Sequence, residues 1–547
     1  MGVALVVRAV VAVRTAAIFN DGPRFLRIAQ DLHRGDWEKG LSDAYHPLYS
    51  LLIQLTHVCF SFFSIPSWEA AAVACSVLAG ALAVVPLYAF VRRAFDPTAA
   101  WIAALALAVH PYAVRFSADV QSDAVYLLLF LCAVALLYRA LSQPRAAAGW
   151  AFASGLASGL AYLTRPEGIV VPVVAVLLWG IAMARTDRRP GIGWRWLAAL
   201  AAGTLVCATP YWMAIRRLTG IWRVSQKKSI FDLLGVGDAL PAETGEAASG
   251  VFATLGEPLL LMAVLVVAAV AGRASLRWFT RREVSDVGRR WGAAGLALLA
   301  VLAFVVLAPD AAGHFGAVFV STLRPELLLL VAVGVASTWR GAPHSRAVFV
   351  CVFLAVHAVV FVGLLLNAGY LDRRHVLPPV VLLFGWVGVG APALAEVVRT
   401  ALQRIRVVRG PAAGSGATAT LIVVLAMVAI GLPKSLADHR SEERAARRAA
   451  EWLSEQPLPA GRVAALRSKF AYYAKREWVP LVTETKLRPV RALLSERVRY
   501  VIAEAGVHRG GLDLVAHLRD AGGREVFQVG VDGRQAFVFE LTREAGS

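Results

Sequence analysis

Residues 68–90 read WEAAAVACSVLAGALAVVPLYAF, and this stretch decides the fold class. Its only charged residue is Glu69, so a helix built from it is apolar on every face. About 20 such residues cross the hydrocarbon core of a bilayer, which is roughly 30 Å thick. Surface helices of soluble domains keep one polar face over that length. The stretch therefore predicts a transmembrane span.

Similar apolar runs recur along the chain. Of its 547 residues 58% are hydrophobic and 17% are charged, whereas soluble domains are usually about 45–50% apolar. We predict 13 spans, near 2–19, 68–90, 98–114, 120–138, 147–163, 168–184, 195–214, 252–272, 291–308, 325–338, 347–366, 376–397 and 417–433. The predicted fold is an all-α polytopic membrane bundle of about 13 transmembrane helices, formed by residues 1–433.

The net charge of +19 has its origin in arginines that lie between the apolar runs. If the N-terminus is cytoplasmic, every predicted inside loop is basic, as the positive-inside rule requires. We therefore expect a multi-pass protein of the bacterial plasma (inner) membrane, surrounded by membrane lipids, and no nucleic-acid partner. The long predicted outside loops are residues 20–67 and 215–251.

Residues 434–547 are polar and contain no spanning run. They begin with a charged helical stretch at 438–453. Short β-like runs follow at 463–466, 499–503, 526–529 and 536–541. We predict a small α/β domain on the periplasmic or extracellular side.

The first outside loop begins with Asp21, directly after the first predicted span. Residues 23–34 are amphipathic at helical spacing and predict a helix lying along the membrane interface. Asp21 stands where the N-cap of that helix falls, and capping is the commoner use of an aspartate there. His46 opens the next apolar stretch and means little by itself.

Together these residues resemble glycosyltransferase family 39, of the C-type superfamily. The motifs in order are Asp21 before the amphipathic helix, Gly35-Asp36-Trp37, His46-Pro47-Leu48-Tyr49, Ala118-Asp119-Val120-Gln121-Ser122-Asp123, Leu163-Thr164-Arg165-Pro166-Glu167-Gly168, Tyr370 to Pro378, and Ala471-Tyr472-Tyr473. The sequence departs from the family pattern where Phe25 replaces a tyrosine and where one proline is missing after His46. Each motif is weak alone, but their order and shared outside placement are fairly specific.

The resemblance implies an enzyme that moves a sugar from a polyprenyl-phosphate donor to a lipid, glycan or protein hydroxyl, with inversion. A carboxylate would serve as general base, and the family's catalytic acid corresponds to Asp21. Asp119 and Asp123 would orient the acceptor or support Asp21. The carboxylates would also suit a divalent metal ion, although the sequence has no compact ligand cluster.

The lipid phosphate that leaves needs fixed cations near its developing charge. Candidates for donor binding are His46, Arg165, Lys227, Lys228, Tyr370, Arg373 and Arg374. The arginines have an alternative use, which is to snorkel or to pair with Glu167 and Asp372. Loop lysines are usually only solvated.

Two other functions remain open at this point. A transporter or flippase would use intramembrane charges and repeated halves, and Arg8 and Arg14 lie inside the first predicted span. However, no repeat is visible, and the other candidate charges gather on one predicted side. A non-catalytic membrane scaffold would have no need of Asp21 for any activity.

Overall fold

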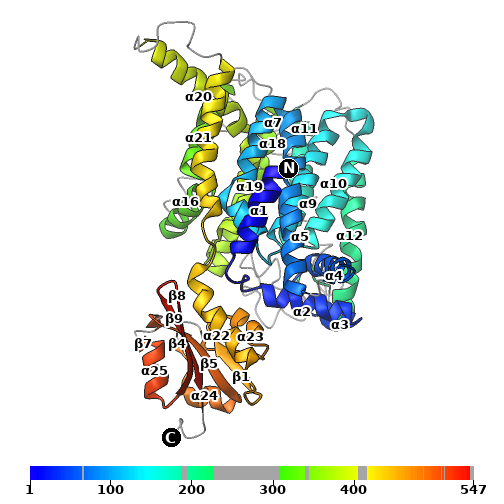
Figure 1. Cartoon of the computed structure of the whole chain (residues 1–547). Coiled ribbons are helices and arrows are strands. Elements are labelled where there is room, and N and C mark those ends of the chain that lie inside the picture. The colour runs from blue at the N-terminus through cyan, green and yellow to red at the C-terminus, as the bar shows by residue number, and fades with distance from the viewer. Residues whose placement is uncertain are drawn as a thin grey trace.

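The computed structural model describes residues 1–64, 67–185, 194–220, 222–226, 308–338, 344–404, 416–483, 486–506, 508–509 and 512–541. The predicted span 252–272, nearly all of 291–308, and most of the predicted outside loop 215–251 lie outside these residues. The described part consists of a helical bundle and a smaller domain with a β-sheet below it (Figure 1).

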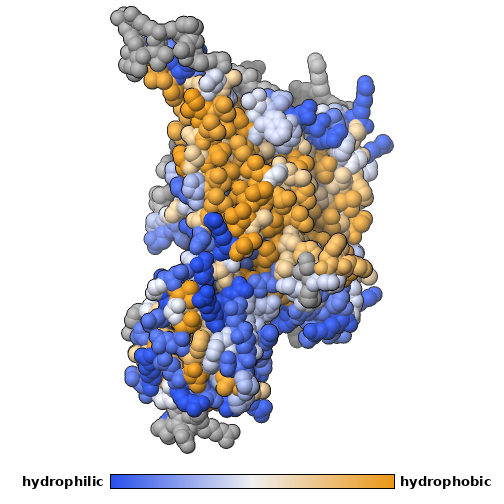
Figure 2. All heavy atoms as spheres, viewed as in Figure 1, coloured by the Kyte–Doolittle hydropathy of each residue, from blue (hydrophilic) through white to orange (hydrophobic). Residues whose placement is uncertain are grey.

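Helices of different lengths, most of them apolar, form the bundle. They are α1 (Gly2–Arg14), α5 (Trp68–Leu82), α6 (Val84–Ala94), α7 (Pro97–Ala108), α8 (Pro111–Ser117), α9 (Asp123–Ser142), α10 (Ala147–Tyr162), α11 (Val170–Arg185), α12 (Arg195–Thr219), α16 (Pro309–Leu323), α17 (Pro325–Thr338), α18 (His344–Ala368), α19 (Arg373–Leu382), α20 (Phe384–Arg404) and α21 (Gly416–Leu436). On the face shown in Figure 2, apolar residues cover the middle of the bundle, whereas most of the surface of the smaller domain is polar. Such an apolar surface suits a lipid environment.

Within the described residues, five helices are long and apolar enough to cross a membrane, or up to eight if each bent pair is one span. The bends separate α7 from α8 by 57°, α16 from α17 by 88° and α19 from α20 by 58°. Pro111 and Pro325 begin the second helix at two of these bends, because proline lacks the N–H that would continue the first helix. The count of 13 spans remains a prediction.

Buried polar side chains form hydrogen bonds with backbone carbonyl groups that have no helical partner at these bends. Arg8, fully buried in α1, donates to the carbonyl oxygens of Ala108 and Leu107 at 3.1 and 3.3 Å. The ring of His110 lies 2.9 Å from the carbonyl oxygen of Thr322, near the end of α16. Unsatisfied carbonyls are costly in the apolar interior, so both side chains stabilise the broken helices. Arg8 is thus occupied in joining α1 to α7.

Close helix packing depends on small residues. A Cβ atom on Gly155 of α10 would lie 2.1 Å from the carbonyl oxygen of Leu200 in α12. On α17, a Cβ atom on Gly334 would meet the carbonyl oxygen of Trp386 at the same distance. Backbones that approach this closely are typical of helix pairs in membranes.

The segment between α1 and α5 forms three helices, α2 (Gly22–His33), α3 (Trp37–Leu41) and α4 (Leu48–Ser61). Helix α2 confirms the predicted amphipathic helix, since Phe25, Ile28 and Leu32 are buried and Arg27 is exposed. These helices lie at the end of the bundle that faces the smaller domain (Figure 1).

A five-stranded sheet forms the centre of the smaller domain, with the order β2-β1-β5-β9-β8. The strands are β1 (Arg462–Ala465), β2 (Trp478–Pro480), β5 (Val498–Glu504), β8 (Arg524–Val531) and β9 (Arg534–Glu540). Strand β1 runs parallel to β2 and β5, whereas β9 runs antiparallel to β5 and β8. The four strand positions predicted from sequence are confirmed.

Alternate residues of the sheet face two different cores. Val463, Tyr500 and Val538 pack with helices α22 (Arg444–Glu455) and α23 (Ser468–Tyr473). Ala464, Val501 and Phe539 pack on the other face with α24 (Val490–Ser495) and α25 (Leu514–Asp520). The first core continues into the membrane domain, because it also contains Ala17, Ile18, residues of α2 and Tyr49 of α4. The two parts of the chain therefore share one apolar core.

Candidate functional site

Charged side chains from four separate helix ends meet next to the amphipathic helix. Asp21 precedes α2, Asp123 begins α9, Arg165 follows α10 and Arg374 lies in the first turn of α19. The Nη1 of Arg374 lies 3.2 Å from the Oδ2 of Asp21, and its Nε lies 3.8 Å from the Oδ2 of Asp372. The structure thus joins two predicted site residues that are far apart in sequence.

Asp21 does not cap its helix with its side chain. It occupies the N-cap position of α2, but its carboxylate accepts no hydrogen bond from the first turn. The expected capping role is therefore wrong for the side chain. Instead the carboxylate, 23% exposed, faces Arg374 and the phenol of Tyr45, which hydrogen-bonds to it. Burial, and then the charge of Asp21, raise the pKa of Tyr45, so this phenol remains a proton donor.

Asp123 and Arg165 form a second group beside the first. Arg165 contacts Asp123, and its Nη2 lies 3.0 Å from the Oε1 of Glu167. Asp123 is buried and lies close enough to Arg374 and Asp21 to interact with both charges. The alternative interpretation of Arg165 as a partner of Glu167 is confirmed, and Asp123 is an additional partner.

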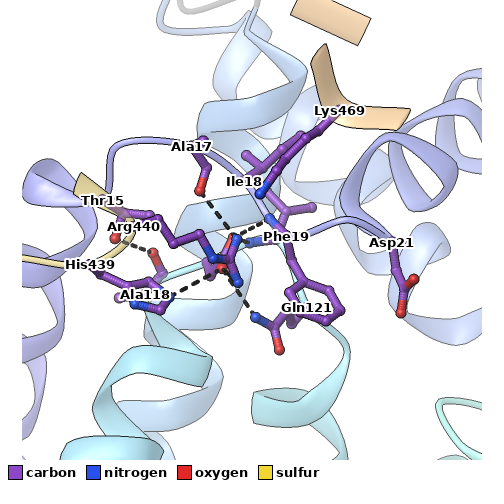
Figure 3. Close-up of polar contacts among 12 residues, drawn as sticks. Thr15, Ala17, Ile18, Phe19, Asp21, Ala118, Gln121, His439, Arg440 and Lys469 are labelled. Carbon is purple, nitrogen blue, oxygen red and sulfur yellow. Dashed lines mark hydrogen bonds and ion pairs between the residues drawn. The ribbon is translucent and has the colours of Figure 1, made fainter. Parts of the chain in front are cut away.

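Asp119 faces away from this group, toward the smaller domain. Its fully buried carboxylate lies 2.8 Å from the Nη2 of Arg440 and accepts hydrogen bonds from the backbone N–H groups of Phe19 and Val120 at 2.9 and 2.7 Å (Figure 3). The side chain of Gln121 donates to it as well. Although burial opposes its ionisation, Arg440 and His439 hold the pKa of Asp119 below its usual value.

The remaining predicted residues differ in their surroundings. Arg373 is exposed, its Nε donates to the hydroxyl of Ser321 at 3.2 Å, and its guanidinium lies 4.9 Å from the ring centre of Tyr112. Among the residues that the structure describes, no carboxylate lies within ion-pair distance of Arg373. Tyr370 is also exposed.

His46 is buried between the rings of Tyr162 and Tyr211, whose centres are 4.9 and 5.1 Å away, and it contacts Ser225. Lys227 and Lys228 lie outside the described residues.

No group of three or more His, Cys, Asp or Glu side chains in the described ranges is arranged to hold a metal ion. The carboxylates near Asp21 are instead interleaved with arginines, which compensate their charge.

Sequence reasoning missed two residues that contact the predicted ones. Tyr45 directly precedes His46, and its place beside the His-Pro-Leu-Tyr motif is the signal that would have drawn attention to it. Arg440 lies in the polar tail, and no local pattern connects it with Asp119. Only the fold brings these two residues together.

Comparisons with known proteins concern the class of the protein. Residues 46–213 match the family model described as dolichyl-phosphate-mannose-protein mannosyltransferase, a range that includes Asp119, Asp123 and Arg165 but not Asp21. No curated protein matches the chain.

Among solved structures, the oligosaccharyltransferase of the archaeon Archaeoglobus fulgidus in its apo form is similar at a TM-score of 0.54 and 14% identity, over 92% of this chain and 69% of that one. The same enzyme with an inhibitory peptide and a dolichol-phosphate gives a TM-score of 0.53, with the same identity and coverage. ArnT from Cupriavidus metallidurans in the apo state has a TM-score of 0.47 at 17% identity, over 100% of this chain and 98% of that one. The family model and the shared fold confirm the predicted resemblance to C-type membrane glycosyltransferases.

Proposed function

We propose that this protein transfers a sugar from a polyprenyl-phosphate donor to a hydroxyl group of a lipid, glycan or protein acceptor. The observation that carries the proposal is the position of the Asp21 carboxylate. It makes no capping hydrogen bond to α2 and lies partly exposed beside Arg374 and Tyr45. The matched family is described by a dolichyl-phosphate-mannose donor, and one similar structure contains a dolichol-phosphate, which supports a lipid-linked donor. Asp21 lies where an interfacial helix would meet such a lipid.

In the proposed reaction, Asp21 accepts the proton of the acceptor hydroxyl as its oxygen attacks the anomeric carbon of the sugar. The bond between that carbon and the phosphate oxygen breaks, and the lipid phosphate leaves with the electron pair. One displacement of this kind inverts the anomeric configuration. Asp123 would orient the acceptor, since it is the buried carboxylate next to Asp21.

Arg374, which pairs with Asp21, and its sequence neighbour Arg373 would take the phosphate. Arg373 is exposed and has no carboxylate partner among the described residues, so its charge is open to an anion. Arg374 is paired with Asp21. A phosphate that binds Arg374 would release Asp21 from this ion pair and leave its carboxylate free to contact the acceptor hydroxyl. Donor binding would then precede activation of the acceptor.

The proposal is tested by transfer of radiolabel from a sugar linked to undecaprenyl phosphate onto candidate acceptors, with the purified full chain. We expect Asp21→Asn to lower turnover by roughly 10²–10⁴-fold, because the general base is lost. The matched control is Asp36→Asn, which changes another aspartate at a helix N-cap in the same loop and should retain full turnover. Equal turnover of Asp21→Asn and the parent would remove Asp21 as the base.

A further inference from the structure

The segment that carries Asp21 has no regular structure of its own. Residues 15–21 connect α1 to α2, and three of their backbone N–H groups bond to parts of the chain beyond these two helices. Ala16 donates to the carbonyl oxygen of His439 at 3.1 Å, Ile18 to the hydroxyl of Tyr473 at 2.9 Å, and Phe19 to Asp119. Two of these three acceptors belong to the polar tail.

The carbonyl groups of the same segment are bound in the same way. Arg447 donates to Ala16 at 3.0 Å, Arg440 donates to Ala17 at 3.2 Å, and the hydroxyl of Ser468 donates to Asn20 at 3.0 Å. Irregular backbone needs partners wherever water is scarce. Here the tail provides them, so the path of residues 16–20 depends on the tail.

Arg440 is the centre of these contacts (Figure 3). One side of its guanidinium binds Asp119, another binds Ala17, and its charged carbon lies 4.9 Å from the ring centre of Phe19. Its backbone has φ 57°, in the left-handed region that non-glycine residues rarely adopt. Such a conformation persists only where surrounding contacts determine it.

Phe19 connects this contact group with the site. Its ring lies 4.9 Å from the guanidinium of Arg440 and 5.2 Å from that of Arg374, the residue that pairs with Asp21. A shift of Phe19 would therefore move both the backbone before Asp21 and the partner of its carboxylate. The carboxylate of Asp119 accepts a hydrogen bond from the backbone N–H of Phe19 at 2.9 Å.

We infer that the C-terminal domain is a positioning element for Asp21, and that Asp119 and Arg440 are its central pair. In this role Asp119 fixes the backbone before Asp21 and neither binds substrate nor accepts its proton. The catalytic consequence rests on the proposed function, whereas the positioning itself can be measured without any substrate. A misplacement of about 1 Å at a catalytic group can cost roughly 10²-fold in rate.

The experiment is hydrogen–deuterium exchange, read by mass spectrometry, on the full chain in lipid nanodiscs. Arg440→Ala should make the peptide that contains residues 15–21 exchange at least about tenfold faster, because Asp119 and the carbonyl of His439, which accept from its N–H groups, lose the Arg440 side chain that fixes them. Tyr473→Phe should accelerate exchange at Ile18 alone. The matched control is Arg444→Ala, which removes exposed ion pairs to Asp438 and Asp532 and should leave the peptide unchanged.

Unchanged exchange in Arg440→Ala would overturn the inference. Arg440→Lys guards against general misfolding, because it keeps a cation beside Asp119 and should restore most of the protection. Where transfer activity is detected, Arg440→Ala should lower kcat by about 10–100-fold and leave the KM for the donor unchanged. A rise in KM with kcat unchanged would contradict positioning. Faster exchange without any transfer activity in the parent would count against the proposed function alone.

Discussion

Asp21 and Asp119 are both aspartates bound to arginine, yet their surroundings differ. The Asp21 side chain is 23% exposed and its partner Arg374 is 17% exposed, whereas the Asp119 side chain is fully buried and accepts backbone hydrogen bonds as well. An exposed pair can exchange partners with a substrate. A buried and fully bonded pair cannot do so without breaking the fold locally. By this difference Asp21 is available for chemistry, whereas Asp119 fixes the position of the backbone.

Deletion of the two carboxylates should lower the free energy of unfolding by different amounts. Asp119→Ala leaves the largely buried guanidinium of Arg440 without its partner, and we expect a loss of about 3–5 kcal/mol in the free energy of unfolding. Asp21→Ala removes a partly exposed pair and should cost only about 1 kcal/mol or less. Thermal unfolding in the same detergent measures both, and equal losses would erase the distinction between the pairs.

Acid should lower the stability that the pair of Asp119 and Arg440 contributes. The pKa of Asp119 is lowered in the folded protein, so its stabilisation is fully present above the unfolded value of about 4 and is lost as the pH falls through the folded value. The melting temperature of the parent should therefore fall more steeply below about pH 4 than that of Asp119→Asn. Parallel curves for the two proteins would show that Asp119 is not bound as described.

The smallest expected effect concerns the cation beside the site. Arg373→Gln removes a charge that no described carboxylate compensates, and we expect about tenfold weaker binding of undecaprenyl phosphate, or about 1.4 kcal/mol. The matched control is Arg399→Gln, an exposed arginine on α20 that pairs with Glu396. Binding measured by fluorescence quenching should separate the two, and equal affinities would exclude Arg373 from the donor site.

Much of the fold follows from the sequence. Apolar runs at 68–90, 120–138 and 195–214 correspond to helices, and alternating residues of the tail correspond to strands of the sheet. Hydropathy did not reveal that the runs at 98–114 and 376–397 are broken helices. A helix bend depends on partners such as Arg8 and His110, which satisfy the carbonyls left free, and these partners come from elsewhere in the chain.

The site was predictable only in part, for a related reason. The order of the motifs pointed to Asp21, Asp123, Arg165 and Arg374. In the structure each of them lies at or near a helix end on one side of the bundle. The same reasoning grouped Asp119 with them, although its side chain faces Arg440 of the tail. The direction in which a buried aspartate points depends on tertiary contacts, and a motif does not contain that information.

The central claim is that Asp21, not Asp119, exchanges a proton with the acceptor. The most direct measurement is the pH dependence of kcat/KM for the parent, Asp21→Asn and Asp119→Asn, with a lipid-linked sugar that the parent uses. We predict that Asp119→Asn lowers the rate by a similar factor at every pH at which it remains folded, and so keeps the acid limb of the profile. Asp21→Asn should lose that limb together with most of its rate. Loss of the acid limb in Asp119→Asn, with the limb retained in Asp21→Asn, would contradict the account.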